Sequence, residues 1–138
     1  MTTTHAELAA DLRDALGPIY RRLISEKTLS VGQSRVLSTL AAGGPTTSAS
    51  LALSERITPQ SIAVIVGDLE RQGRIARTHD ATDGRRLIIE ITDAGREAIA
   101  VDRHATHTWL AAAVGELDDE DRAALARAVG VLRRLATA

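Results

Sequence analysis

The sequence contains no cysteine, almost no aromatic residues and no long hydrophobic run. Without cysteine the chain forms neither disulfides nor thiolate zinc sites, and it has no cysteine-based redox sensor. Tyr20 and Trp109 are the only aromatic residues, so the core must consist of Leu, Ile, Val and Ala. No apolar run approaches the roughly 18–20 residues that span a bilayer, and no basic segment followed by an apolar one opens the chain. We therefore expect a cytoplasmic protein with no membrane partner.

The charges of the chain are almost balanced. The 138 residues include 17 lysines and arginines against 18 acidic residues, so the net charge is −1. Any nucleic-acid binding must therefore come from where the charges lie. The sequence has no serine–histidine–acid arrangement, no glycine loop for phosphates and no convincing set of metal ligands. We accordingly expect neither an enzyme nor a bound cofactor.

Helical periodicity dominates both ends of the chain. Apolar residues recur every three to four positions over residues 5–28, although Gly17-Pro18 predicts a kink or two abutting helices. Further helices are predicted over residues 31–42, 93–114 and 117–136, the last with acidic residues at its N-terminus and arginines near its C-terminus. Residues 1–138 are expected to form a single domain.

Between residues 47 and 73 the sequence predicts two helices joined by a tight turn. Thr47 is a suitable N-cap for a short helix that ends near Glu55. Thr58 followed by Pro59 is a second N-cap signal, and the helix that it opens ends at Gly73 with its apolar residues on one face. Two such helices in succession are typical of a helix-turn-helix.

The next stretch, residues 74–92, reads RIARTHDATDGRRLIIEIT and predicts a β-hairpin. RIART and RLIIEIT are the strands, and DATDG supplies the turn. Arg85 and Arg86 follow the turn directly, and five arginines stand against two acidic residues between Arg71 and Arg86. A hairpin placed straight after a helix-turn-helix is a wing, so its basic tip is positioned to contact DNA. In an unrelated hairpin the same two arginines would be only a solvated turn.

The chain resembles a known family, the multiple antibiotic resistance regulator (MarR) family. The resemblance extends over essentially the whole chain, and no single motif carries it. The matching residues, in order, are Leu51-Ala52, Ile57-Thr58-Pro59-Gln60-Ser61, Leu69-Glu70 with Gly73, Ile75 with Arg77, Asp83-Gly84-Arg85-Arg86, and Ile91-Thr92 with Gly95.

The resemblance implies a fold class that is mainly α with a small β-hairpin wing. A winged-helix lobe over about residues 31–92 would be flanked by dimerisation helices over about residues 5–28 and 93–137. The homodimer would bind double-stranded DNA at an inverted-repeat operator, as a repressor that a small-molecule effector releases. In the family, the position of Arg85 reaches into the minor groove, and the position of Asp83 pairs with an arginine at the Arg77 position to brace the wing.

Three groups of residues are candidates for contact with DNA. Hydroxyls near the N-terminus of the first helix of this helix-turn-helix suit phosphates. Simple capping is the structural interpretation of these hydroxyls, and both roles can hold together. On the recognition helix, about residues 59–72, Gln60 can bind an adenine edge, and three neighbours can contact a thymine methyl. The candidate residues are Thr47, Ser48 and Ser50 for phosphates, Thr58, Pro59, Gln60, Ser61, Ala63 and Val64 for bases, and Arg85 and Arg86 on the wing.

One departure from the family pattern favours an alternative function. Many members carry a polar residue and an arginine where this chain has Ala63-Val64, and no basic residue lies between Pro59 and Leu69. A dimeric winged-helix interaction module with weak or lost DNA binding would fit these residues as well.

Five further residues, namely two histidines, one aspartate and two aromatic residues, can be interpreted either as functional or as structural. His104 and His107 lie at i, i+3 spacing near Asp102, which could chelate a metal, but we favour a polar helix surface and predict no metal site. Tyr20 and Trp109 could line an effector pocket between the dimerisation helices and the DNA-binding lobe. As lone large side chains they are more often anchors of a core or a dimer interface.

The apolar residues of the first and last helices are expected to pack between two chains. These residues are Leu8, Leu12 and Leu16 near the N-terminus and Val129, Leu132 and Leu135 near the C-terminus. On sequence grounds, truncation after Gly115 should abolish folding as well as dimerisation.

Overall fold

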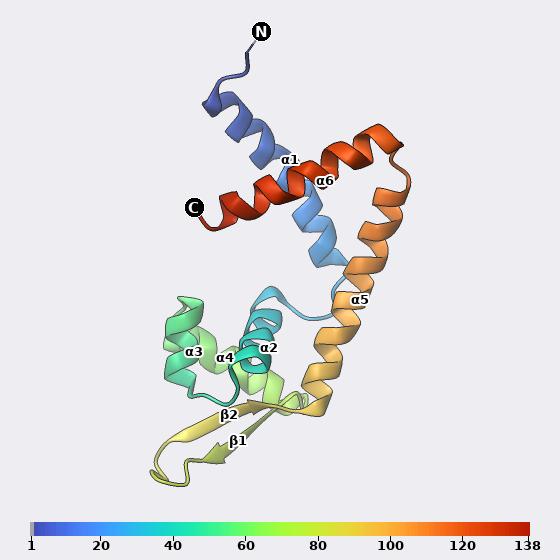
Figure 1. Cartoon of the computed structure of the whole chain (residues 1–138). Helices are drawn as coiled ribbons and strands as arrows, with labels where there is room; N and C mark the ends of the chain where they lie inside the picture. The colour runs from blue at the N-terminus through green and yellow to red at the C-terminus, as the bar shows by residue number, and fades with distance from the viewer. Residues whose placement is uncertain (1) are drawn as a thin grey trace.

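The computed structural model describes residues 2–138, which form a winged-helix lobe and a helical stem. The stem contains α1 and α6 and the distal part of α5, which starts at the hairpin (Figure 1). The hairpin and the stem helices α1 and α6 lie at opposite ends of the molecule. The elements are α1 (His5–Ser25), α2 (Val31–Gly43), α3 (Ser48–Glu55), α4 (Pro59–Arg71), β1 (Ile75–His79), β2 (Leu87–Ile91), α5 (Asp93–Gly115) and α6 (Asp119–Ala136). The predicted fold class, mainly α with one small hairpin, is confirmed.

Short polar side chains set where the helices begin. Thr47, Thr58 and Thr92 each accept a hydrogen bond from the backbone N–H three residues further on, at the starts of α3, α4 and α5. Asp118 does the same for α6, whose first turn is acidic and whose last turn is basic. Each cap satisfies a donor that the helix itself leaves unpaired, so local sequence accounts for these four boundaries.

Helix α1 runs without interruption through Pro18. The sequence had favoured a kink or two abutting helices at this point, but the structure has one continuous helix from His5 to Ser25. Proline removes one backbone donor, which leaves the carbonyl of Asp14 without its usual partner. Both Pro18 and Asp14 are exposed, so water can solvate that carbonyl.

No helix within residues 2–138 combines the length and apolar character that a bilayer span requires.

The hydrophobic core lies in the lobe. Helix α2 supplies its centre and packs against α3, α4 and β2, whereas α1 and α6 contribute no buried residue. The core therefore fixes the recognition helix relative to the hairpin, and it does so without the two terminal helices. The largest fully buried side chains are Leu37, Leu40, Leu51, Ile62, Leu69, Ile89, Val36 and Val66.

The hairpin is fastened to the lobe at its base. β1 and β2 pair antiparallel, and Thr46 adds one further bridge through two hydrogen bonds with Ile89, of 3.0 and 2.7 Å. At the start of α5 the chain passes so close to the α4–β1 turn that a Cβ on Gly95 would lie 2.2 Å from the carbonyl oxygen of Arg74. Only glycine fits there, so the wing and α5 keep a fixed relation.

A buried carboxylate joins the stem to the lobe. Asp102 of α5 is only 3% exposed and accepts hydrogen bonds from Thr28 N (2.8 Å), Thr28 Oγ1 (2.8 Å) and Leu29 N (3.0 Å) in the α1–α2 connection. Burial by itself raises the pKa of this carboxyl, but the hydrogen bonds from Thr28 and Leu29 outweigh burial and bring the pKa below its ordinary value. Asp102 is thus an ionised cap for a connection more than seventy residues away in sequence.

Candidate nucleic-acid interface

The two helices of the helix-turn-helix begin with the same arrangement of hydroxyls. Thr47 Oγ1 accepts from Ser50 N at 3.2 Å and donates to Ser50 Oγ at 3.0 Å. Thr58 Oγ1 likewise accepts from Ser61 N at 3.1 Å and donates to Ser61 Oγ at 3.0 Å. The capping interpretation of Thr47 and Thr58 is therefore correct. Their hydroxyls are largely engaged within the chain, which leaves the free backbone N–H groups of the first turns to meet an anion.

Helix α4 has one apolar, buried face and one exposed face. Ile62, Val66 and Leu69 are buried against the lobe. The predicted base-contacting residues are exposed on the other side, and Val64 is 64% exposed. The exposed residues are Thr58, Pro59, Gln60, Ser61, Ala63 and Val64. Among the phosphate candidates, Ser50 is exposed, and Thr47 and Ser48 are half-buried.

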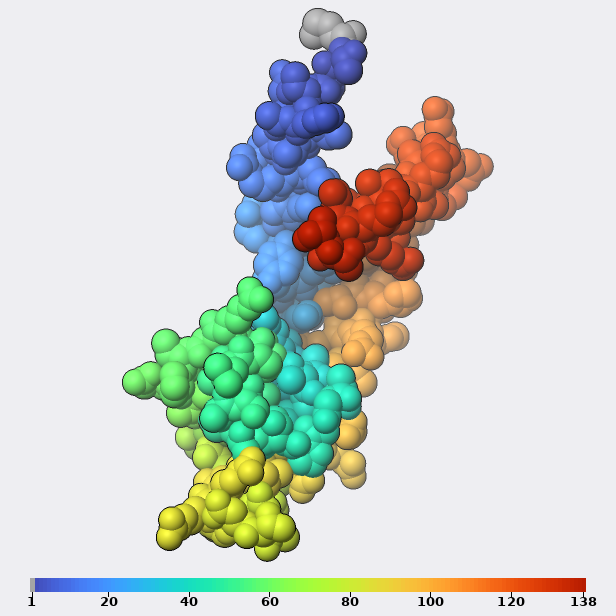
Figure 2. All heavy atoms as spheres, turned by 60° about the vertical axis from the view of Figure 1, so that its left-hand side comes forward, coloured from blue at the N-terminus to red at the C-terminus, as the bar shows by residue number. Residues whose placement is uncertain are grey.

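The tip of the wing is organised by its own polar side chains. Asp80 accepts hydrogen bonds from Thr82 N (3.0 Å) and Thr82 Oγ1 (2.9 Å), which hold the pKa of its carboxyl below the ordinary value. The ring of His79 donates through Nδ1 to the carbonyl oxygen of Gly84 at 2.7 Å, because a carbonyl can only accept. The tip is thereby shaped before it meets a partner, and Figure 2 shows it projecting from the lobe at the end far from the stem.

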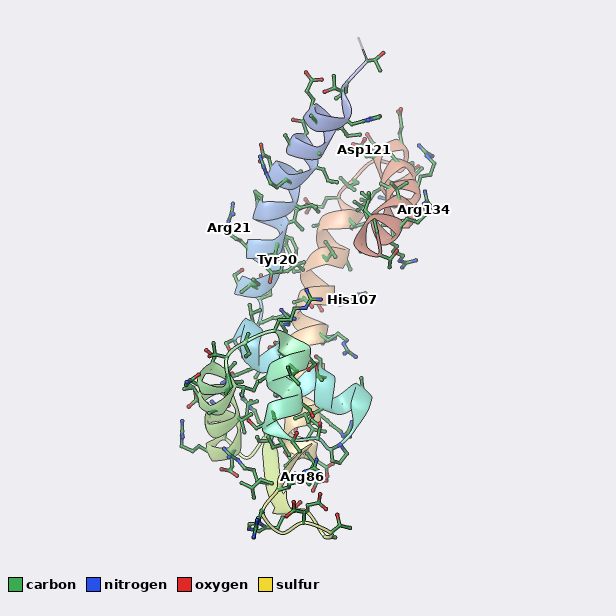
Figure 3. The ribbon with its side chains drawn as sticks, turned by 90° about the vertical axis from the view of Figure 1, so that its left-hand side faces the viewer. Tyr20, Arg21, Arg86, His107, Asp121 and Arg134 are labelled. Atoms are coloured by element: carbon green, nitrogen blue, oxygen red, sulfur yellow. The ribbon has the colours of Figure 1, made fainter. Side chains whose placement is uncertain are left out.

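The two arginines of the wing differ in their surroundings. Arg86, labelled in Figure 3, lies with its Nη1 3.8 Å from Asp80 Oδ2. Within residues 2–138 the guanidinium of Arg85 forms neither an ion pair nor a hydrogen bond, and its residue is exposed. The sequence did not distinguish the two residues in this way. Arg85 can give its full charge to an external anion, whereas Arg86 must share its charge with Asp80.

The predicted brace between Arg77 and Asp83 is not formed. Arg77 Nε instead lies 3.3 Å from Oε2 of Glu70, near the end of α4, in an ion pair without hydrogen-bond geometry. Asp83 accepts from the backbone N–H of Arg85 at 3.1 Å. The physical reason is position, because Arg77 pairs with Ile89 well inside the ladder whereas Asp83 belongs to the tip. The arginine therefore connects the hairpin to the recognition helix, and the aspartate shapes the turn.

Arg56 is a basic residue of the helix-turn-helix that the sequence analysis missed. It ends α3 in the left-handed region, with φ of 54° and ψ of 44°, and it is exposed. A side chain in this conformation costs about 1 kcal/mol or more relative to glycine. The position could have been found from the sequence, because α3 must reverse direction between the cap signals at Thr47 and Thr58. Arg56 adds a cation beside a recognition helix that has none before its last turn.

Tyr20 and Trp109 do not share one environment. Tyr20 is 56% exposed on α1, where Figure 3 shows it above the lobe, and it borders a cavity of about 320 Å³ between stem and lobe. Trp109 is half-buried on α5, and the guanidinium carbon of Arg22 lies 5.3 Å from its ring centroid. The exposure of Tyr20 excludes a place in this chain's own core. The lining residues of the cavity are Tyr20, Leu23, Ile24, Lys27, Val31, Ser34, Arg35 and Thr106.

The structure gives the three candidate metal ligands no common site. Asp102 is buried and accepts three hydrogen bonds from the α1–α2 connection, and His104 and His107 are exposed on α5. Within residues 2–138 no three His, Cys, Asp or Glu side chains come together as metal ligands would.

Comparison with known proteins gives two kinds of match. The model of the MarR family matches residues 27–86, which include the helix-turn-helix and most of the wing. A helix-turn-helix-type transcriptional regulator of Mycobacterium bovis is 30% identical over 138 residues, which cover 98% of this chain and 96% of that protein. A similar regulator of Mycobacterium leprae is 29% identical over the same shares of the two chains.

Solved structures agree with this match. A transcriptional regulator protein from Pseudomonas aeruginosa superposes with a TM-score of 0.84 at 33% identity, covering 99% of this chain and 98% of the other. A mutant of Staphylococcus aureus MepR bound to an oligodeoxyribonucleotide has a TM-score of 0.74 at 20% identity, over 93% and 97% of the chains, and so shares the fold. The lobe, the wing, the full-length relatives and these structures lead to one conclusion: the chain belongs to the MarR family of winged helix-turn-helix transcriptional regulators.

Proposed function

We propose that this protein is a homodimeric, ligand-responsive repressor that acts in the cytoplasm on an inverted-repeat operator. The observation that carries the proposal is the uncommitted guanidinium of Arg85, at the tip of a hairpin that directly follows an exposed recognition helix. In this proposal α4 enters the major groove and Arg85 enters the adjacent minor groove. Bound across a promoter, such a dimer would exclude polymerase.

The stem supports the homodimer. α1 and α6 have exposed apolar side chains but no buried ones, and they border a cavity of about 680 Å³. Such a surface is typical of one half of an interface. A second copy would cover it through the residues predicted from the sequence. Of these, Leu8 is 60%, Leu16 43%, Val129 36% and Leu135 54% exposed, and Leu12 and Leu132 are half-buried.

The cavity beside Tyr20 supports the ligand response. Its volume of about 320 Å³ falls within the range of small-molecule sites. Apolar residues of α1 line one side, and Lys27 with hydroxyls of Ser34 and Thr106 offers partners for an acidic or polar group. Because these residues come from both stem and lobe, a ligand held there would favour one relation between the two parts. That relation sets the distance between the two recognition helices, and hence the affinity for the operator.

Salt titration of operator binding tests the proposal. Arg85→Ala removes a free cation, so the slope of log affinity against log salt should flatten by about one unit per chain. Arg86→Ala is the matched control, because its charge is already shared with Asp80 at 3.8 Å, and its slope should change less. Both residues are exposed, so neither variant should change the thermal stability. Operator selected from a random DNA pool would serve as the probe.

The outcome separates this function from its alternative. If the wild-type protein recovers no DNA from the pool at low salt, the alternative of an interaction module without DNA binding is correct. If Arg85→Ala binds the operator as tightly as wild type at every salt concentration, DNA binding stands but the role of the wing is contradicted.

A further inference from the structure

The exposed face of α4 offers very few polar groups to a base. No charged residue lies between Pro59 and Gly67. The hydroxyl of Thr58 caps the helix and donates to Ser61 Oγ at 3.0 Å, whereas Ser61 keeps its own O–H available to donate. The amide of Gln60 and the O–H of Ser61 are therefore the polar groups of this face that stay uncommitted. What remains is the methyl surface of Ala63 and Val64.

Helical geometry places these three side chains side by side. Residues three and four apart on a helix are neighbours on its surface, so Ala63 and Val64 flank Gln60 one turn further along. Their exposure confirms that the three share the face opposite the core. Val64 is 64% exposed, so its own chain leaves most of this branched apolar side chain uncovered.

We propose that Ala63 and Val64 read the C5-methyl groups of thymines next to the adenine that Gln60 binds. This inference rests on the proposed function, in which α4 enters the major groove. The thymine methyl is the apolar group that a base pair presents in that groove. Against a G·C pair, the same valine would cover an amino group or a carbonyl oxygen without offering it a hydrogen bond. Apolar contact with thymine methyl groups would thus supply the sequence preference that an arginine at this place supplies in many family members.

The replacement of thymine by deoxyuridine tests this inference, because it removes the methyl and leaves the base pairing intact. In an operator selected by the wild-type protein, the critical thymine is the one whose methyl group Val64 contacts. Replacement of this thymine should weaken binding about fourfold per half-site, the value for one buried methyl group. Replacement of thymines outside the half-sites should have no effect. Where cytosine replaces the critical thymine and abolishes tight binding, 5-methylcytosine should recover part of the loss.

Variants of the protein locate the contact. Val64→Ala shortens the side chain, so it should bind the thymine and deoxyuridine operators with nearly equal affinity. Leu53→Ala is the matched control, since Leu53 is also apolar and 82% exposed but lies on α3, and it should keep the fourfold difference. Both positions are exposed, so both variants should fold.

The possible failures are distinguishable. A wild-type protein that recovers no DNA overturns the proposed function and this inference with it. A wild-type protein that binds its operator equally well with thymine or deoxyuridine at every position overturns the inference alone. A methyl effect of the same size in wild type and Val64→Ala overturns the assignment to Val64.

Discussion

The lobe and the stem are both made of amphipathic helices, but they differ in what covers the apolar side. Helix α4 of the lobe buries Ile62, Val66 and Leu69, whereas α1 and α6 of the stem contain no fully buried residue. Helix α1 leaves Leu8 60% and Leu16 43% exposed. The lobe therefore completes its core within one chain, whereas the stem leaves apolar side chains exposed for the second copy that we propose. In the proposed dimer, the lobe would supply the surface that reads DNA, and the stem would set the distance between two such surfaces.

The largest expected effect comes from a charge placed in the stem. Leu16→Glu puts a carboxylate on the apolar face of α1, so the dimer should dissociate at micromolar concentration. Operator affinity should then fall by about a hundredfold or more, because the two half-sites are no longer bound by one molecule. Sedimentation velocity and a gel shift measure the two effects. Arg21→Glu is the control, because Arg21 points away from the body of the molecule (Figure 3), and it should remain dimeric.

Removal of the last helix tests whether the lobe folds without the stem. The sequence alone suggested that a chain ending at Gly115 would not fold. The structure changes this expectation, because α6 contributes no residue to the core of the lobe. The truncated chain should remain monomeric and retain a cooperative unfolding transition in circular dichroism. Loss of that transition would contradict the independence of the lobe.

The next largest effect is expected in the core of the lobe. Leu40 is fully buried, so Leu40→Ala should lower the free energy of unfolding by about 2–5 kcal/mol. The measurement should be made by urea denaturation in the monomeric Leu16→Glu background, where dissociation does not contribute. Val131→Ala serves as a control in α6, because Val131 is 46% exposed and should change this free energy little. Equal losses from the two substitutions would show that stem and lobe form one core.

A smaller effect on stability is expected at Asp102, which joins the stem to the lobe. Asp102→Asn leaves at least one buried N–H of Thr28 or Leu29 facing an amide donor, which should lower the free energy of unfolding by about 1–3 kcal/mol. The pKa of Asp102 is lowered on folding from its ordinary 3.8, so its contribution is fully present above that pH. The contribution is lost as the pH falls through the lower, folded-state pKa.

Urea denaturation at a series of pH values tests the joint. The difference between wild type and Asp102→Asn should be constant from neutral pH down to about 5 and should shrink only in more acidic solution. Asp14→Asn, at an exposed position of α1, should show little difference at any pH. A wild-type advantage that changes between pH 5 and 8 would contradict an ionised Asp102.

Local sequence predicted most of the architecture, because its signals act over three or four residues. The caps at Thr47 and Thr58 and the glycine at Gly73 gave the helix boundaries nearly to the residue. Apolar periodicity on α4 correctly predicted which residues are buried. The order helix, helix-turn-helix, hairpin then sufficed for the fold, since few folds place a hairpin after such a motif.

Contacts that depend on how separate elements pack together escaped prediction. Asp102 was considered as a metal ligand, but its partners lie 73 and 74 residues away, and no pattern in the chain connects them. The pairing of Arg77 with Glu70 depends on how the hairpin leaves α4, which residue spacing does not determine. The sequence did not indicate that Asp80 would lie beside Arg86 and leave the guanidinium of Arg85 without a partner within residues 2–138.

Hydroxyl-radical footprinting of the selected operator would show whether the stem holds two lobes on two half-sites. The predicted result is a symmetrical footprint whose half-sites are centred about 34–36 Å apart, one turn of DNA. Protection should extend into the minor groove at both outer edges, where the wings lie, and should disappear there in Arg85→Ala. A single asymmetric protected segment, or none at the edges in the wild type, would contradict it.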